Sequence, residues 1–147
     1  MINFFVMLYS EIILPVRYYE TDQMGIVHHS NYIRYFECAR NTMMMECGYP
    51  IEKCEQDGVT IPLVSVECRY RYSARMGDVV KVVAIIDEVP MAKLRVRQAV
   101  YNQDGVLCAE GKVTLGFLNK TTGRPTRCPE KLVKAIEAHI NDRTDSE

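Results

Sequence analysis

The segment 30–47 constrains the fold more than any other part of this sequence, because its apolar residues recur at intervals of three and four. That spacing places side chains on one face of an α-helix. The apolar stripe consists of Tyr32, Phe36, Ala39, Met43 and Cys47, and the opposite, polar side carries Arg34, Glu37 and Asn41. Ser30 or Asn31 is a suitable N-cap, and Gly48 with Pro50 beyond it ends the helix. The apolar positions spread wider than a surface helix needs, so we expect a long central helix largely wrapped by a sheet.

Alternating polar and apolar residues predict β-strands in most of the remaining chain. The expected strands are 11–19, 62–72, 78–89, 93–102 and 106–118, and the other expected helices are 51–56 and 129–140. Pro15 lacks a backbone N–H, which restricts the first strand to a sheet edge or a bulge. The turn Asn-Gln-Asp-Gly at 102–105 joins the last two strands as a hairpin. The pattern predicts an α+β fold, with the long helix against one face of a curled antiparallel sheet of about five strands.

The chain length of 147 residues suits one hydrophobic core, so we treat 1–147 as a single domain. The net charge of −1 gives no general attraction to nucleic acid or to an anionic membrane. An apolar leader at 1–8 has no basic segment and is far shorter than the ~20 residues that span a bilayer, which predicts no membrane insertion. Met7 is an alternative start to Met1. The six cysteines form no CxxC pair and follow no secretory signal, which predicts reduced thiols in a cytoplasmic protein.

The loop between the first strand and the long helix gathers groups that suit acid–base chemistry. It contains Asp22, Gly25 and the pair His28 and His29, which directly precede the helix. The first N–H groups of a helix have no partner within it and together carry about half a positive charge. A carboxylate and an imidazole beside such a helix end can stabilise a developing oxyanion. Taken alone, Asp22 also fits a turn-forming aspartate, and His29 also fits a structural helix-terminal histidine.

The motif Y-Y-E-T-D-Q-M-G-I-V-H-H-S-N-Y at 18–32, followed by Y-F-E-C-A-R at 35–40, resembles the signature of a known family. That family is the hotdog-fold acyl-CoA thioesterases of the 4-hydroxybenzoyl-CoA thioesterase superfamily, in its YbgC-like branch. The segments Y-R-Y-S-A-R-M-G-D at 70–78 and T-T-G-R-P at 121–125 extend the resemblance over nearly the whole chain. The resemblance implies hydrolysis of an acyl-CoA to a free carboxylic acid and CoA, without a cofactor. It also implies protomers that pair edge to edge as a homodimer or homotetramer, with active sites at the dimer interface.

The resemblance assigns roles to single residues as well. The catalytic carboxylate falls on Asp22, the supporting histidine on His29, and a positioning tyrosine hydroxyl on Tyr18. The backbone amide that polarises the thioester carbonyl falls at or beside His29. Beyond the resemblance, our own candidates for substrate binding are Met24, Gly25, Val27, Arg71 and Arg75. Because Met24 stands where the family commonly has a small residue, the acyl specificity of the family is not carried over.

Two aspects of substrate chemistry stay open on the sequence. Asp22 can act as a general base toward water, or attack the thioester directly to give a mixed anhydride. The phosphate groups of coenzyme A need basic partners. The candidates for those partners are Arg69, Arg71, Arg75, Arg124 and Arg127.

The sequence also contains alternatives to the Asp22 hypothesis. Glu37 is a rival carboxylate, since some hotdog enzymes place their acid on the helix, but Arg34 and Arg40 at i−3 and i+3 favour a helix ion pair. An acyl-thioester hydratase or dehydratase would need a loop histidine and a helix acid, whereas this loop carries Asp22. A non-catalytic acyl-CoA-binding sensor or scaffold is the alternative from another class. No third ligand at metal spacing accompanies His28 and His29, so we expect no metal site.

Overall fold

The computed structural model describes residues 8–145, and residues 1–7 and 146–147 lie outside the described part. The chain begins with β1 (Leu8–Pro15), passes through a short 3-10 turn at Tyr18–Glu20 and a loop, and enters α1 (Ser30–Glu46). The remaining elements are α2 (Ile51–Gln56), β2 (Val59–Thr60), β3 (Leu63–Tyr70), β4 (Val79–Ile86), β5 (Lys93–Tyr101), β6 (Leu107–Gly116), β7 (Leu118–Asn119) and α3 (Glu130–Asp145).

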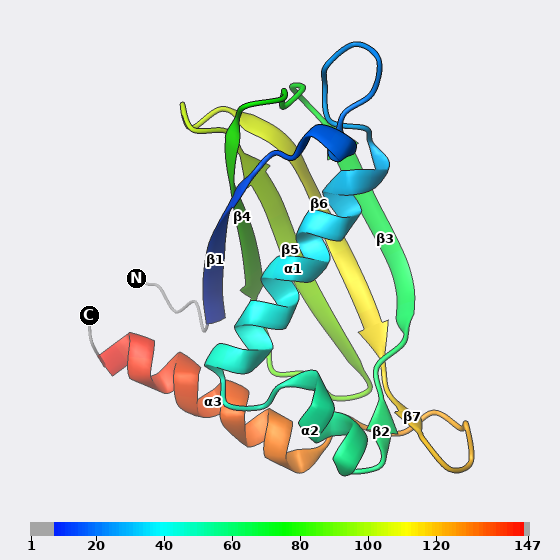
Figure 1. The fold of residues 1–147 in the computed structure, drawn as a ribbon. Coiled ribbons are helices and arrows are strands. Elements are labelled where there is room, and N and C mark those ends of the chain that lie inside the picture. The colour runs from blue at the N-terminus through cyan, green and yellow to red at the C-terminus, as the bar shows by residue number, and fades with distance from the viewer. Residues whose placement is uncertain (1–7, 146–147) are drawn as a thin grey trace.

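Five strands form one antiparallel sheet in the order β1-β4-β5-β6-β3, while β2 and β7 pair separately. The helix α1 lies across one face of the five-stranded sheet (Figure 1). The predicted α+β architecture, with a long helix against a sheet of about five strands, is therefore confirmed. β1 is an edge strand and ends at Pro15, as the missing N–H of that residue predicts. β3 forms the opposite edge of the sheet.

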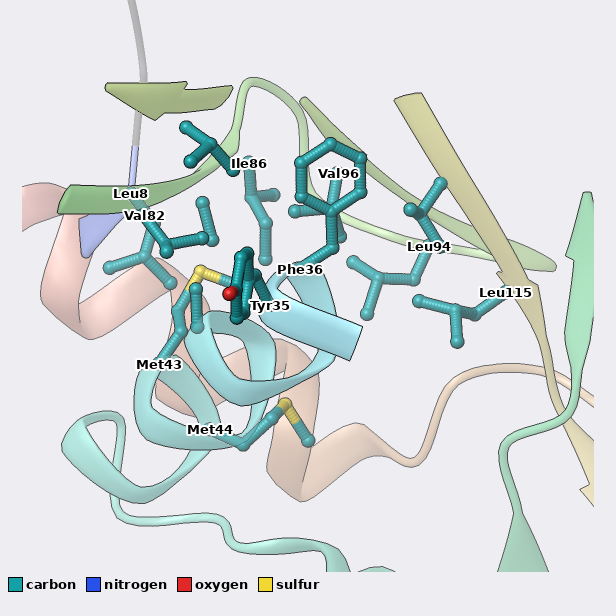
Figure 2. Close-up of a cluster of buried hydrophobic side chains, with 14 of the residues drawn as sticks. Leu8, Tyr35, Phe36, Met43, Met44, Val82, Ile86, Leu94, Val96 and Leu115 are labelled. Carbon is teal, nitrogen blue, oxygen red and sulfur yellow. The ribbon is translucent and has the colours of Figure 1, made fainter. Parts of the chain in front are cut away.

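The hydrophobic core lies between α1 and the sheet (Figure 2). All five residues of the predicted stripe are buried, and the Phe36 side chain is 0% exposed. Facing it are residues that alternate along the strands, such as Val82 and Ile86 in β4 and Val96 in β5. The alternation predicted for β5 is confirmed, because Leu94, Val96 and Val100 are buried while its lysine and arginines are exposed. This packing fixes the position of α1 over the sheet.

Three element ends, the start and end of β1 and the end of α3, differ from the sequence-based expectation. β1 begins at Leu8, which is 5% exposed, so the last residue of the expected leader belongs to the core; the rest of that leader lies outside the described residues. After Pro15 the chain turns instead of continuing as a strand to residue 19. α3 extends to Asp145, beyond the expected end at 140. The assignment of the whole chain to a single domain stays a prediction.

The start of α1 also corrects the prediction. His29, and neither Ser30 nor Asn31, is the N-cap residue. The Ser30 hydroxyl lies 2.8 Å from His28 Nδ1, and the Asn31 side-chain amide donates to the Glu20 carbonyl oxygen at 2.8 Å. Both capping side chains are thus used by the preceding loop. The other end agrees with the sequence, since Gly48 follows the last turn at a φ of 81°.

β3 and β6 approach unusually closely at Gly111. A Cβ atom at this position would overlap the backbone carbonyl oxygen of Glu67 in the neighbouring strand. Only glycine permits this approach, because every other residue would push the two backbones apart. Gly111 therefore determines how near β3, the edge strand that ends at Tyr70, lies to the rest of the sheet.

Candidate active site

The loop that carries Asp22 is pinned to the segment that follows β3. The Asp22 N–H donates to the Ile26 carbonyl oxygen at 2.9 Å, and the Gly25 N–H donates back to the Asp22 carbonyl oxygen at 3.0 Å. This tight turn requires a φ of 75° at Gly25, a conformation that side chains disfavour. The Val27 N–H then donates to the Ala74 carbonyl oxygen at 2.8 Å. The loop is thus a fixed structure, closed on itself and tied to a segment almost fifty residues away in the chain.

Glu20 anchors the loop to α1 through hydrogen bonds, a structural role that the sequence did not predict. Its buried carboxylate accepts hydrogen bonds at 2.8 Å from the Arg17 N–H and from the Tyr35 hydroxyl of α1. Its backbone carbonyl oxygen accepts from the Asn31 amide and, at 2.9 Å, from the His28 N–H. Burial, followed by the hydrogen bond to Glu20, raises the pKa of Tyr35 far above its ordinary value. The network joins the loop to the first turns of α1; in the sequence its only signal is the glutamate within the 18–32 motif.

Asp22 lies in a cavity of about 550 Å³ at this end of the molecule. One carboxylate oxygen, Oδ1, accepts the Met24 N–H at 2.8 Å, which fixes the side chain in an Asx turn. The turn-forming role considered from the sequence is therefore present, and it orients the carboxylate that lines the cavity. Six predicted site residues line this one cavity: Asp22, Met24, Val27, His29, Arg71 and Arg75.

His29 lies where the loop meets α1. The Asn31 N–H is used by the His28 carbonyl oxygen at 2.9 Å, and the Tyr32 N–H points to the His29 carbonyl oxygen at 3.4 Å. Among the hydrogen bonds of the described residues, none uses the His29 N–H. The His29 ring packs edge-to-face against Tyr70 with ring centroids 6.3 Å apart. An unused backbone donor at the start of a helix therefore lies on a residue that lines the Asp22 cavity.

Three tyrosines that were not predicted as site residues complete the cavity wall: Tyr32, Tyr70 and Tyr72. The Tyr70 hydroxyl donates to the His29 carbonyl oxygen at 3.3 Å, and the Tyr32 hydroxyl accepts the Ala74 N–H at 3.1 Å. Burial raises the pKa of Tyr32 above its ordinary value, so its hydroxyl stays protonated near neutrality. The alternation within the expected strand 62–72 puts Tyr70 and Tyr72 on the same face, but it does not indicate that this face meets the Asp22 loop.

Two of the predicted residues do not line the cavity. The Tyr18 side chain is 79% exposed to solvent. Gly25 shapes the turn beneath Asp22.

The rival carboxylate Glu37 is exposed on α1 and borders a different cavity, of about 210 Å³, whose walls include Met43, Met44 and Leu94. Within the described part of the chain, no salt bridge at contact distance joins Glu37 to Arg34 or Arg40. Burial lowers the pKa of Arg40, while the charge of Glu37 acts against this and favours the protonated form, so the predicted pairing is present only as a longer-range attraction. Arg40 instead donates to Gln98 Oε1 at 3.0 Å.

The remaining titratable groups of the described chain do not suggest a second catalytic centre. The rings of His28 and His29 stack with centroids 4.1 Å apart, and no cluster of three possible metal ligands occurs among the described residues. All six cysteines are free thiols. None of the described helices combines the length and the apolar character that a membrane crossing requires.

Comparison of the chain with known proteins shows the family to which it is similar. The model of the thioesterase-like superfamily matches residues 16–136. An Aquifex aeolicus protein named as an esterase by assignment is 36% identical to this chain over 122 residues. The match covers 83% of this chain and 93% of that protein. The acyl-CoA thioester hydrolase YbgC of Escherichia coli is 26% identical over 121 residues, or 81% of this chain and 90% of that one. The solved structure of a DHNA-CoA thioesterase from Staphylococcus aureus has a TM-score of 0.84 at 24% identity and covers 95% of both chains, which shows the same fold.

Proposed function

This chain belongs to the thioesterase-like superfamily, and we propose that it hydrolyses the thioester bond of an acyl-CoA with Asp22 as the catalytic carboxylate. The products of this hydrolase are a free carboxylic acid and CoA. One observation supports the role of Asp22: it lines the same cavity as His29, the N-cap residue of α1. A thioester carbonyl in this cavity would have a carboxylate and an N–H donor within the same walls.

In the first form of the mechanism, Asp22 acts as a general base. Its Oδ1 is held by the Met24 N–H, and the carboxylate takes a proton from a water molecule. The resulting hydroxide attacks the thioester carbon, and negative charge moves onto the carbonyl oxygen. When the tetrahedral intermediate collapses, the C–S bond breaks and the CoA thiolate takes up a proton.

In the second form, the Asp22 carboxylate attacks the thioester carbon directly. The C–S bond then breaks to give a mixed anhydride and the CoA thiol, and water hydrolyses the anhydride in a second step. A single turnover in isotopically labelled water distinguishes the two forms. Label found in the Asp22 carboxylate by mass spectrometry indicates an anhydride that water attacks at the aspartyl carbon, and acylated Asp22 in a rapidly quenched turnover indicates one that water attacks at the acyl carbon. Neither signal, with label in the released acid, supports the general base.

The His29 N–H is the proposed oxyanion donor. It is a backbone group at a helix start, so it needs no reorganisation when charge develops on the carbonyl oxygen. One such donor contributes about 3 kcal/mol in comparable enzymes, or about a hundredfold in rate. The His29 imidazole, held against Tyr70, supports this site and is the proposed proton donor to the leaving thiolate.

The substrate-binding proposals follow the cavity walls. Met24 and Val27 offer apolar surface beside Asp22, and Arg71 and Arg75 offer positive charge. Gly25 contributes through the turn that presents Asp22. The role of Tyr18 as a positioning hydroxyl stays a prediction, and a Tyr18→Phe variant with unchanged kcat/KM would contradict it.

We propose further that the enzyme is a cytoplasmic homodimer or homotetramer in which protomers pair through β3. This strand is a sheet edge, and Leu63 and Val64 near its start are each 51% exposed. An exposed apolar edge is a template for pairing with a second chain. Light scattering with Val64→Lys tests this, since a charge on the edge should shift the protein toward a monomer.

The experiment that tests the catalytic proposal is thiol release from a panel of aliphatic and aromatic acyl-CoA esters. We expect Asp22→Asn to lower kcat/KM at least about a hundredfold while the fold persists, because asparagine keeps the acceptor for the Met24 N–H but cannot take a proton. Asp104→Asn in the hairpin turn is the matched control and should retain full activity. Loss of activity in Glu37→Gln but not in Asp22→Asn would overturn the assignment.

The same assay decides between the remaining alternatives. Binding of acyl-CoA without turnover by the wild type would indicate a sensor or scaffold. Addition of water to an unsaturated acyl-CoA without thiol release would indicate a hydratase.

A further inference from the structure

A second hollow, of about 480 Å³, lies on the face of the sheet that is turned away from α1. The core side chains of β4, β5 and β6 point toward α1, so the residues that alternate with them point to this outer face. Ala99 and Val83 are neighbours in register and contribute small and apolar surface to the hollow. We call it the basic hollow, because its lining includes Arg69, Arg71, Lys81, Arg97 and Lys112.

The charges of the basic hollow do not cancel within the chain. Five cationic residues line it, against the two carboxylates Glu67 and Glu110. Two of the cations have carboxylate partners: Arg71 pairs with Glu110 at 2.8 Å, and Arg97 makes a bidentate contact with Asp87.

The other cations of the hollow lack such partners among the residues that the structure describes. Among the described residues, no salt bridge reaches Arg69 or Lys112. The Lys81 ammonium lies 5.3 Å from the centre of the Tyr101 ring and has no carboxylate partner in the same set. The hollow thus retains excess positive charge in a chain whose net charge is −1.

The strand register places like charges side by side at one point of the hollow. Lys112 of β6 lies directly opposite Arg97 of β5, while Glu67 of β3 lies opposite Lys112 on its other side. Like charges in opposite positions of two antiparallel strands destabilise the sheet. An anion bound between them would relieve that repulsion, so the arrangement suits a multiply charged anionic ligand.

Arg71 connects this hollow to the Asp22 cavity, since it lines both. A ligand that extends from Asp22 past Arg71 therefore reaches the outer face of the sheet. Arg124 and Arg127, by contrast, lie between β7 and α3 and line neither cavity. Of the five candidate arginines in the sequence, the geometry selects those at one side of the molecule.

We propose that the basic hollow binds the phosphorylated nucleotide end of coenzyme A while the thioester lies beside Asp22. This inference rests on the proposed acyl-CoA substrate. Arg69 and Lys112 supply the charge for the phosphates, and Arg71 guides the chain of the substrate between the two cavities. The acyl group plays no part in this contact, so the hollow recognises the carrier and not the acid.

The test compares an acyl-CoA with the same acyl ester of pantetheine, which lacks the nucleotide and its phosphates. In Arg69→Gln/Lys112→Gln we expect KM for the acyl-CoA to rise about fivefold to tenfold, by loss of charge-assisted contacts, with kcat unchanged. KM for the pantetheine ester should not change. The matched control is Lys93→Gln, which removes a cation from an exposed position of β5 outside the hollow. In wild type, added salt should raise KM for the acyl-CoA alone.

A double variant that folds and keeps the wild-type KM for the acyl-CoA would overturn the inference, as would an equal rise for both esters. Calorimetric titration with free CoA provides a readout that does not depend on turnover. If the wild type hydrolyses neither ester, the proposed function fails. Weaker CoA binding by the double variant, but not by Lys93→Gln, would then still support the hollow, and equal binding by all three proteins would overturn it.

Discussion

The loop that carries Asp22 and the core beneath α1 are held together by opposite means. In the loop, Glu20 and its hydrogen-bond partners fix the backbone, while the Asp22, Met24 and His29 side chains stay partly or fully exposed. In the core, Phe36 and its neighbours are fully buried and are held by packing. The difference indicates that the polar network contributes the geometry of the site, whereas the apolar contacts contribute most of the stability.

The largest expected effect comes from cutting into the core. Phe36→Ala should lower the free energy of unfolding by about 3–5 kcal/mol, because it removes a fully buried ring and leaves a cavity. Urea denaturation measures this loss, and kcat/KM of the folded fraction should stay near the wild-type value. Cys38→Ala, at an exposed position of the same helix, is the control and should shift stability by less than about 0.5 kcal/mol. A large loss of kcat/KM in folded Phe36→Ala would contradict the view that the core contributes stability and not the geometry of the site.

A smaller effect separates two tyrosine hydroxyls that each donate to a carboxylate. Tyr35 donates to Glu20 under the loop, and Tyr49 donates to Asp57 at the opposite end of α1. Tyr35→Phe should cost about 1–2 kcal/mol of stability, since the buried Glu20 carboxylate loses a donor. Tyr49→Phe should cost less, since Asp57 is exposed and water can replace the lost hydroxyl.

The two variants should differ in activity. Only Tyr35→Phe should lower kcat, because only that bond positions the loop, while KM changes little in both. Steady-state kinetics on both variants gives the answer. Equal kcat values would mean that the Glu20 network has no more influence on catalysis than a distant bond of the same kind.

The remaining expected effect is a pH dependence of stability that arises in the core alone. Burial raises the pKa of Cys54 to about 11 and that of Cys128 to about 12, from an ordinary value of 9.0. Below pH 9 both states keep these protons. As pH rises toward 11, the unfolded chain loses them first, so stability falls, by at most about 1.4 kcal/mol per pH unit for each thiol.

Urea midpoints between pH 8 and pH 10.5 measure this slope. Tyr35 and Tyr49, whose pKa values are also raised by burial, add to it at the upper end. Cys54→Ala should make the dependence shallower, since it removes one of the buried thiols. A variant with the same slope as the wild type would contradict the role given to Cys54.

The sequence predicts features that depend on near neighbours in the chain. The buried stripe of α1, the alternation of β5 and the hairpin at 102–105 each follow from local spacing or turn chemistry, and all three are present. The resemblance at 18–32 named residues that share one cavity, although their roles stay predictions.

Features that depend on distant contacts were missed. Local capping rules predict Ser30 or Asn31 as the N-cap, since such rules do not include the hydrogen bond from the Asn31 side chain to the distant Glu20 carbonyl oxygen. Tyr70 lies in the site because the segment that follows β3 is joined to the Asp22 loop. The β-bridge between Ile26 and Arg75 is one of these long-range contacts. Periodicity gives the face of a strand, but it does not give the element that this face will meet.

The close approach at Gly111 has a consequence for how such a protein can vary. In a library that samples every amino acid at every position, position 111 should return almost no survivors other than glycine, while its neighbour Lys112 should accept many replacements without loss of folding. Two adjacent positions would then be under different selection, position 111 for assembly of the sheet and position 112 for substrate binding. A change at Lys112 leaves a folded protein for selection to act on, and a change at Gly111 does not.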